Sequence, residues 1–177
     1  MGKRYVLTGG PGFGKSTLVN ELAKKGFYAV PEAARILVEE YQKKPGYKLW
    51  KDLNETEIID FQQRLLAKQL ELEKIIPYDM DAFLDRSTID NVAYFNLKRI
   101  RPSDNIVSEA SNAKFDKVFL LEALSNYGSD AVRYESLSEA IEIEECAIRT
   151  YNSFRYDLVR VPSMPIEDRV KFVLDKI

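Results

Sequence analysis

The sequence predicts a three-layer α/β sandwich, in which helices cover both faces of a mostly parallel sheet. Short apolar runs of β type alternate with amphipathic helical patterns along the chain, and this alternation is typical of β-α-β units. The fourth apolar run, Val118–Leu121, is almost continuous, as expected of a parallel strand that is buried on both faces. Because the 177 residues are 45% hydrophobic and contain no repeat or linker, we expect one domain over residues 1–177.

Two strands and three helices are expected in the first half of the chain. The first helix stops at Gly26, which suits a C-cap, and Pro31 is placed to start the second helix. Asn54 and Glu57 form a capping pair before a long amphipathic helix, which Pro77 ends. In order, the elements are a strand over 3–8, a helix over 15–25, a strand over 27–30, a helix over 31–44 and a helix over 54–76.

The second half is expected to add three strands and three helices. Residues 100–114 are polar and predict irregular structure, and residues 123–136 predict a loop. Ser136 or Ser138 opens the helix that follows this loop. In order, the elements are a strand over 82–84, a helix over 88–99, a strand over 117–121, a helix to about 152, a strand over 158–161 and a helix over 165–176.

Composition excludes several classes of function. With 26 Lys and Arg against 28 Asp and Glu, the net charge of −2 gives no reason to expect a nucleic-acid partner. No apolar run is long enough for a membrane span, and the single cysteine, Cys146, suits a cytoplasmic protein. The chain has no histidine, so any acid–base chemistry falls to carboxylates.

The turn after the first strand has the spacing of a phosphate-binding P-loop (Walker A), with glycine, four residues, glycine, lysine and serine. Its backbone N–H groups and the start of the next helix would face the phosphates of a nucleoside triphosphate. Lys15 would reach the β- and γ-phosphates, and we expect its side chain to be in solvent when no phosphate is bound. Ser16 would ligate Mg²⁺. The residues expected to contact the nucleotide are Gly10, Gly12, Phe13, Gly14, Lys15, Ser16 and Thr17.

Asp85 follows the third apolar run, where a P-loop protein needs a carboxylate near Mg²⁺. The alternative is a simple cap for the next helix, because Asp and Ser commonly cap helices after strands. Given the P-loop, we favour the metal role for Asp85.

Glu32 follows the second strand, at the edge of the sheet where open α/β sheets bind ligands. It is a candidate base toward a substrate hydroxyl. Two structural alternatives are equally open: favourable placement in the first turn of a helix, and an i, i+3 pair with Arg35.

Three further features are weaker. Arg133, after the fourth strand, is placed to neutralise charge on a transferring phosphoryl group, although a solvated loop arginine is the simpler interpretation. The cluster Lys98, Arg99 and Arg101 is typical of a solvated helix end, with an anionic ligand as the alternative. Four aromatic residues are candidates for stacking on a base, although core packing is the simpler interpretation. They are Phe61, Tyr94, Phe95 and Tyr151.

These segments resemble a known family over nearly the whole chain. The runs GGPGFGKSTLVNELAKKGF, VPEAAR, FLDRSTID and FDKVFLLE, with the closing LVRVPSMPIEDRVKFVL, are similar to the small AAA-domain P-loop ATPases that include the TRPL translocation defect protein. More broadly, the chain resembles P-loop kinases. Asp85-Arg86-Ser87 is similar to the acidic-Arg-Ser motif of deoxynucleoside kinases, and Asp130 to Arg133 resembles the lid of ribosylnicotinamide kinases.

The resemblance implies a kinase-group sheet of five parallel strands in the order 2-3-1-4-5, with a lid over about 123–136. It implies that Glu32 is the catalytic glutamate and that Arg86 contacts the acceptor or the transferred phosphate. No guanine-selecting Asn-Lys-x-Asp run follows the fourth strand, so ATP is the expected nucleotide and GTP stays open.

We therefore expect a Mg·ATP-dependent phosphotransferase whose acceptor is a small hydroxyl-bearing molecule, with a nucleoside or nucleotide-like compound favoured. Its expected catalytic residues are Lys15, Glu32, Asp85, Arg86 and Arg133, with Ser16 and Asp85 at the metal. Arg35 and Arg64 are candidate acceptor contacts. The alternative is a nucleotide-dependent switch that hydrolyses the triphosphate slowly and presents a changed loop to a partner.

Overall fold

The computed structural model describes residues 1–43, 46, 48, 52–124 and 135–177. Its elements alternate along the chain as the sequence predicts. In order they are β1 (Arg4–Thr8), α1 (Lys15–Ala23), β2 (Tyr28–Val30), α2 (Ala33–Gln42), α3 (Glu55–Lys74), β3 (Ala82–Asp85), α4 (Thr88–Leu97), α5 (Asp104–Asn112), β4 (Lys117–Leu121), α6 (Leu137–Ser153), β5 (Leu158–Val161) and α7 (Ile166–Leu174).

The five strands form one sheet in the order β2-β3-β1-β4-β5, and every neighbouring pair is parallel. This confirms the predicted strand order. In the register of the central strands, Leu7 lies opposite both Asp85 and Phe119. Since parallel strands end at a common edge, the segments that follow β1, β2 and β3 must meet there.

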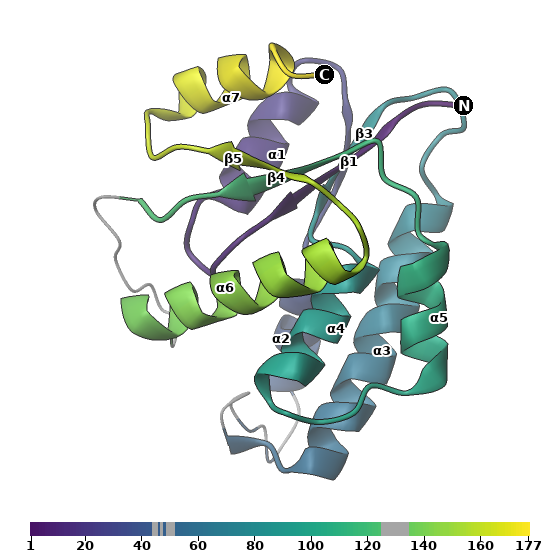
Figure 1. Ribbon diagram of the computed structural model, residues 1–177. Helices are drawn as coiled ribbons and strands as arrows, with labels where there is room; N and C mark the ends of the chain where they lie inside the picture. The colour runs from purple at the N-terminus through teal and green to yellow at the C-terminus, as the bar shows by residue number, and fades with distance from the viewer. Residues whose placement is uncertain (44–45, 47, 49–51, 125–134) are drawn as a thin grey trace.

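Helices cover both faces of the sheet (Figure 1). Because successive side chains along a strand point to opposite faces of the sheet, the apolar side chains are divided between two cores, one on each face. Val6, Leu84 and Val118 point to the face covered by α3, α4, α5 and α6. Leu7 and Phe119 point to the opposite face, where α1 and α7 pack. The predicted three-layer sandwich is confirmed.

Helix starts follow the capping signals in the sequence. Asn54 and Glu57 form a reciprocal capping box at α3. Ser136, rather than Ser138, is the N-cap of α6, and its side chain accepts from the Glu139 N–H. Such caps satisfy N–H groups that a helix start would otherwise leave without partners.

The region 100–114 differs from its predicted irregular structure, because α5 forms within it. This helix follows Ser103, and only Ile106 and Ala110 are buried along it. Two apolar contacts four residues apart are too few to give a visible helical period in a polar segment. Packing against α4 and the core stabilises it instead.

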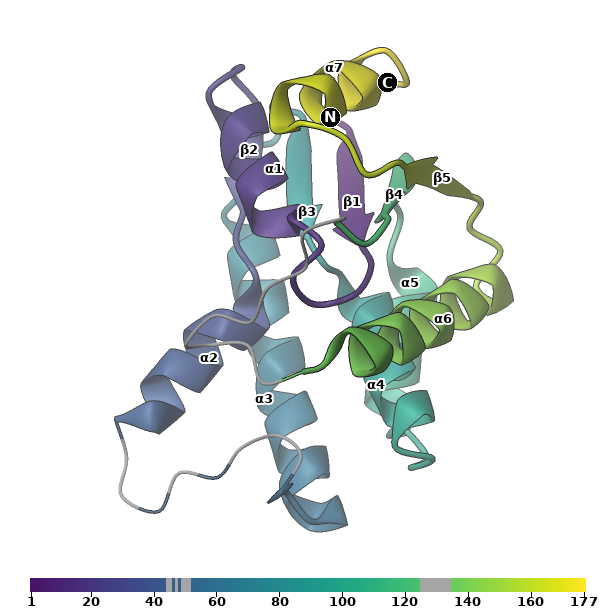
Figure 2. The same ribbon diagram turned by 90° about the vertical axis from the view of Figure 1, so that its left-hand side faces the viewer.

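The loop between β1 and α1 curves under the carboxyl ends of the strands, and α2, α3 and α6 approach this end of the sheet (Figure 2). A small apolar cluster of Ala33, Leu37 and Leu65 joins α2 to α3. Within the described residues, every helix is too short or too polar to cross a bilayer.

Candidate active site

A pocket of about 220 Å³ opens at the carboxyl edge of the sheet. The P-loop forms one wall, and α2 and α3 form the other, with the segment after β3 between them. Lys15, Glu32 and Arg86 reach it from the segments that follow three different strands. The residues lining it are Pro11, Gly12, Gly14, Lys15, Ser16, Thr17, Glu32, Ala34, Arg35, Val38, Phe61, Gln62, Leu65, Arg86, Tyr94 and Glu135.

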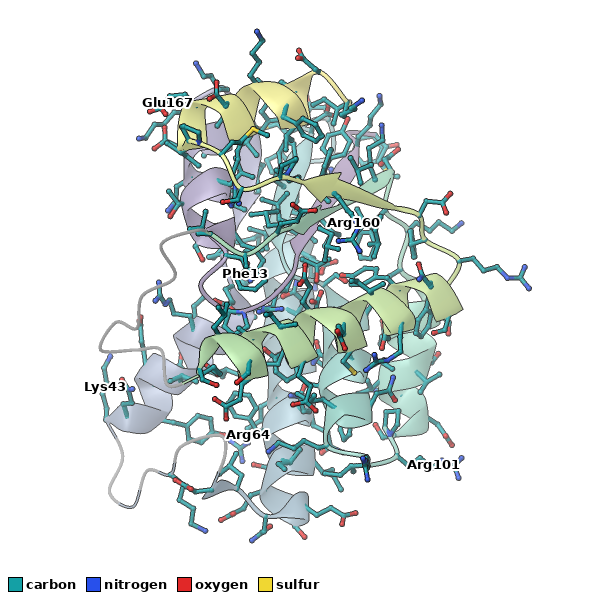
Figure 3. The ribbon with its side chains drawn as sticks, turned by 60° about the vertical axis from the view of Figure 1, so that its left-hand side comes forward. Phe13, Lys43, Arg64, Arg101, Arg160 and Glu167 are labelled. Carbon is teal, nitrogen blue, oxygen red and sulfur yellow. The ribbon has the colours of Figure 1, made fainter. Side chains whose placement is uncertain are left out.

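The P-loop passes very close to the neighbouring strand. Gly9 has a φ of 130°, and a Cβ built on it would lie 2.6 Å from the Leu121 carbonyl oxygen. Only glycine permits this approach. Of the residues predicted to contact nucleotide, Gly10 and Phe13 do not line the pocket, and the Phe13 side chain is buried in the core beneath α1 and α7 (Figure 3).

Lys15 is buried, with 5% of its surface exposed. Its ammonium group donates to the carbonyl oxygens of Gly10 at 2.8 Å and Gly9 at 3.2 Å. Burial, and then the charge of Arg86, lower the pKa of Lys15 to about 8. The expectation that this side chain is in solvent was therefore wrong. The loop folds back over its own lysine and supplies backbone carbonyls as acceptors.

Asp85 ends β3 and lies against the start of α1. The Ser16 hydroxyl donates to its Oδ2 at 2.5 Å, whereas Oδ1 is buried and has no hydrogen-bond partner within the described residues. The alternative role as a helix cap is contradicted, because Ser87 is the N-cap of α4. A buried carboxylate oxygen without a donor, beside a serine hydroxyl, has the hard-oxygen chemistry that Mg²⁺ prefers.

The electrostatics at Asp85 also suit a cation. Burial, followed by the charge of Glu32, raises the pKa of Asp85 to about 6, although Lys15 and the Ser16 hydrogen bond oppose the rise. Bound Mg²⁺ would reverse this shift. Among the described residues, no group of three or more acidic or cysteine side chains is arranged to hold a metal ion.

Glu32 lies immediately before α2 and lines the pocket. It does not cap the helix with its side chain. Instead, its Oε1 accepts from Nε of Arg86 at 3.0 Å, so its ion pair is a contact across the site rather than the i, i+3 pair with Arg35 that was one of the open alternatives. Burial alone would raise the pKa of Glu32, but Arg86 and Lys15 outweigh it and the pKa is lowered. Glu32 is therefore ionised near neutral pH.

Arg86 occupies an unusual backbone conformation, with φ of 72°. A non-glycine residue in this left-handed region is uncommon and costs on the order of 1–3 kcal/mol. The conformation turns the side chain between two carboxylates, since Nη1 also donates to Oδ1 of Asp90 at 3.2 Å. The guanidinium carbon lies 5.6 Å from the centre of the Tyr94 ring.

Asp90 was not predicted as a site residue, yet it is buried and accepts four hydrogen bonds. Thr8 donates from the end of β1 at 2.7 Å, and the Ser87 N–H donates at 2.9 Å. Tyr151 of α6 donates its hydroxyl at 2.6 Å, and Arg86 completes the set. The sequence does contain two signals for Asp90, an i, i+4 arginine and a Ser-x-x-Asp capping box.

Other predicted contacts fall elsewhere. Arg64 pairs with Asp60 one turn earlier on α3, and it is not among the residues that line the pocket. Arg101 projects from the chain well away from the P-loop (Figure 3). Arg35 does line the pocket. Of the aromatic candidates, Phe95 and Tyr151 belong to the core, whereas Phe61 and Tyr94 line the pocket. Arg133 and most of the predicted lid lie outside the described residues.

Comparison with known proteins addresses the family and the fold of the chain. A family model described as an AAA domain matches residues 4–169. No curated protein matches the chain in sequence. The structure of the NadR protein in complex with NR superposes with a TM-score of 0.76 and 18% identity, over 98% of this chain and 50% of that one. The chain described here thus spans half the length of that NadR chain.

Two solved kinases match along most of their own length. Thymidylate kinase from Candida albicans has a TM-score of 0.68 and 18% identity, over 99% of this chain and 91% of that one. Deoxyadenosine kinase from M. mycoides, solved with the products dCMP and dCDP, has a TM-score of 0.66 and 16% identity, over 98% and 97%. At these identities the likeness shows the fold, which is that of a P-loop kinase.

Proposed function

The chain belongs to the AAA-domain family, and from this premise we propose that it is a phosphotransferase that moves a phosphoryl group from Mg·ATP to a small hydroxyl-bearing acceptor. The acceptor class that we propose is a nucleoside or a nucleotide-like compound. One observation carries the proposal. The carboxylate of Glu32 lines the same pocket as the P-loop residues Lys15 and Ser16.

The P-loop side of the pocket would hold the triphosphate. The ammonium group of Lys15 already lies within the loop and would exchange the carbonyls of Gly9 and Gly10 for phosphate oxygens. Ser16 and Asp85 would hold Mg²⁺, as the unpartnered Asp85 oxygen supports. When bound, Mg²⁺ supplies positive charge against the phosphate oxygens.

Glu32 would act on the acceptor. Its carboxylate would orient the hydroxyl and accept its proton, while the hydroxyl oxygen bonds to the γ-phosphorus and ADP leaves with the electrons of the broken P–O bond. Arg86 would position Glu32, because its Nε holds one carboxylate oxygen of that residue. Since Asp90 holds Arg86 in turn, the base is oriented by a chain of ionic hydrogen bonds.

The outer part of the pocket supports an acceptor with a flat apolar portion. Phe61, Val38 and Leu65 contribute apolar surface, and Tyr94 contributes a second ring. Gln62 lines the pocket too, and its buried Oε1 has no partner within the described residues. A ligand that offers an N–H or O–H donor there would satisfy this oxygen, as a nucleobase or an amide-bearing ring can.

A switch that only hydrolyses its nucleotide is the competing proposal. The walls of α2 and α3 favour the kinase, because a switch needs no acceptor pocket beside its phosphates. The test is a screen of nucleosides, nucleotides and vitamin-like alcohols with ATP labelled at the γ-phosphate. We expect label on one acceptor class and little free phosphate. Release of labelled phosphate alone, with every acceptor unmodified, would support the switch.

A further inference from the structure

Arg169, on the last helix, α7, is buried, with 2% of its surface exposed. Its guanidinium group connects three segments that are distant in the sequence. Nη1 donates to the Phe13 carbonyl in the P-loop at 2.6 Å, and Nη2 donates to the Glu122 carbonyl after β4 at 3.0 Å. Nε donates to the Pro162 carbonyl after β5 at 3.1 Å. Thus a residue from the opposite end of the chain holds the back of the P-loop.

Arg169 forms no ion pair in the described part of the chain, because all three acceptors of its guanidinium group are backbone carbonyls. The Glu122 carboxylate pairs instead with Arg160, at 3.7 Å. Burial lowers the pKa of Arg169, with Glu122 opposing, but a guanidinium stays charged in proteins. Burying a cation without a direct ion pair is costly, so a ligand of opposite charge nearby would recover part of that cost.

The contact with Phe13 also sets the direction of a peptide group. The C=O of residue 13 and the N–H of residue 14 belong to one planar trans peptide and point in opposite directions. Because the Phe13 carbonyl points out of the loop to Arg169, the Gly14 N–H points to the loop's inner side. Within the described residues this N–H meets no backbone carbonyl.

Gly14 and Arg169 are also in close contact. Gly14 has a φ of 89°, and a Cβ built on it would lie 3.2 Å from Nη1 of Arg169. Gly14 is the N-cap of α1 and lines the pocket beside Lys15. The positive charge of the guanidinium group therefore lies directly behind the Gly14 backbone. The other side of this backbone would face the phosphates.

We propose that Arg169 is a positioning residue for the nucleotide phosphates: it orients the Phe13–Gly14 peptide so that the Gly14 N–H donates to a phosphate oxygen, and it adds a buried positive charge that the bound polyanion balances. The inference rests on the nucleotide-binding part of the proposed function and is independent of the acceptor. A purely structural clamp is the alternative, in which Arg169 stabilises the fold without affecting the ligand.

The first test separates affinity from stability with two variants. Arg169→Met keeps the apolar stem and removes the charge and all three donors, whereas Arg169→Lys keeps the charge and a single donor group. Titration calorimetry with Mg·ATP is done at a temperature where circular dichroism shows each variant folded. We expect Arg169→Met to lose at least ten-fold in affinity and Arg169→Lys to recover part of that loss. The control, Arg160→Met at an exposed position of β5, should bind as the wild type does.

A second test uses the unchanged chain, in case a buried substitution prevents folding. In ¹⁵N-labelled protein, titration with Mg·ADP should move the Gly14 amide proton downfield, as a new hydrogen bond to phosphate requires. An unmoved Gly14 amide at saturation, or wild-type Mg·ATP affinity in folded Arg169→Met, would overturn the proposal. Loss of affinity in Arg169→Met together with an acceptor screen that fails would leave this inference intact and remove only the transferase proposal.

Discussion

Glu32 and Arg86 are 54 positions apart in the sequence, yet Nε of Arg86 donates to Oε1 of Glu32 at 3.0 Å. The contact engages one carboxylate oxygen, and the other remains for the pocket that Glu32 lines. It also keeps the carboxylate ionised, since Arg86 is the main charge that offsets the effect of burial on the pKa of Glu32. In the proposed reaction, this pair would prepare Glu32 to accept a hydrogen bond from the hydroxyl of the acceptor.

Glu32→Gln tests that role. The change keeps the size of the side chain and removes its capacity to accept a proton. Because phosphoryl transfer has a loose transition state in which the base mainly orients the hydroxyl, we expect kcat to fall by roughly 10²–10⁴. Single-turnover transfer to the acceptor found in the screen measures it, with ATP affinity expected to be unchanged.

Glu39→Gln, on the exposed side of the same helix, is the matched control and should transfer phosphate at the wild-type rate. Full activity in Glu32→Gln would rule out the assignment of Glu32 as the base. A variant that loses ATP affinity as much as turnover would place Glu32 at the triphosphate instead.

Asp85→Asn removes the carboxylate charge while preserving its shape. We expect transfer to fall and the Mg²⁺ concentration needed for half-maximal rate to rise, because the proposed metal site loses its anionic ligand. Initial rates over a Mg²⁺ series provide the measurement. The variant should keep its fold, since α4 is capped by Ser87 and Asp90 rather than by Asp85. Unchanged Mg²⁺ dependence at the normal rate would contradict the metal role.

The same variant gives a pH test. The folded pKa of Asp85 is about 6, above its ordinary value of 3.8, so the folded state binds the proton more tightly than the unfolded state does. Above about pH 6, the ionised carboxylate of Asp85 therefore lowers the free energy of unfolding by up to about 3 kcal/mol. This loss disappears as the pH falls toward 4. In the absence of ligand at pH 7.5, Asp85→Asn should unfold at a higher urea concentration than the wild type. This difference in midpoint concentration should shrink at pH 4.5. An equal or growing difference at the lower pH would show that desolvation of Asp85 is not the cause.

Lys15→Met tests the buried ammonium group. Its contacts with phosphate would be charge-assisted hydrogen bonds worth about 1.5–3 kcal/mol each, so Mg·ATP affinity should fall ten-fold or more. Methionine fills the space of the lysine stem, which matters because the side chain is buried. Calorimetric titration of both proteins measures the loss. Lys25→Met, at an exposed position after α1, is the control, and equal affinities for Lys15→Met and wild type would refute the P-loop assignment.

Tyr151→Phe tests the support behind Arg86. The single hydroxyl proton of Tyr151 goes to Asp90, so the Ser87 hydroxyl must donate to the Tyr151 oxygen at 2.7 Å. Deleting this oxygen leaves two buried polar groups with one partner fewer, and we expect the free energy of unfolding to drop by about 1–3 kcal/mol. Urea denaturation measures it. Tyr78→Phe, at a position 73% exposed, should change stability by less than about 0.5 kcal/mol.

Much of the fold follows from local signals in the sequence. The P-loop, the buried apolar strands and the caps at Asn54 and Ser136 are local patterns, and they predicted the elements and their alternation. The helix at 104–112 was not predicted, because it is stabilised by packing and its sequence shows no helical repeat of apolar residues. The strand order, by contrast, required the resemblance to P-loop kinases, since nothing local in the strands encodes their neighbours.

The site was predicted in its outline but not in its connections. The spacing of the P-loop indicated Lys15, places after strands indicated Glu32 and Asp85, and the resemblance to P-loop kinases indicated Arg86. That Glu32 contacts Arg86 rather than its neighbour Arg35 depends on the left-handed turn of Arg86, which spacing does not reveal. The burial of Lys15 depends on how the loop closes over it, which is likewise a tertiary property.

The order of the strands also has a consequence for how this chain folds. Among the described residues, the central strand, residues 4–8, pairs with residues 82–85 and 117–121, so its hydrogen bonds with neighbouring strands can form only when segments far away in the sequence come together. Non-local pairing of this kind slows folding, because loop-closure entropy is lost before the contacts compensate for it. The P-loop and the strand ends that complete the pocket belong to those late pairings. Nucleotide recognition therefore arises only when the sheet is assembled, and a partly folded chain would lack it.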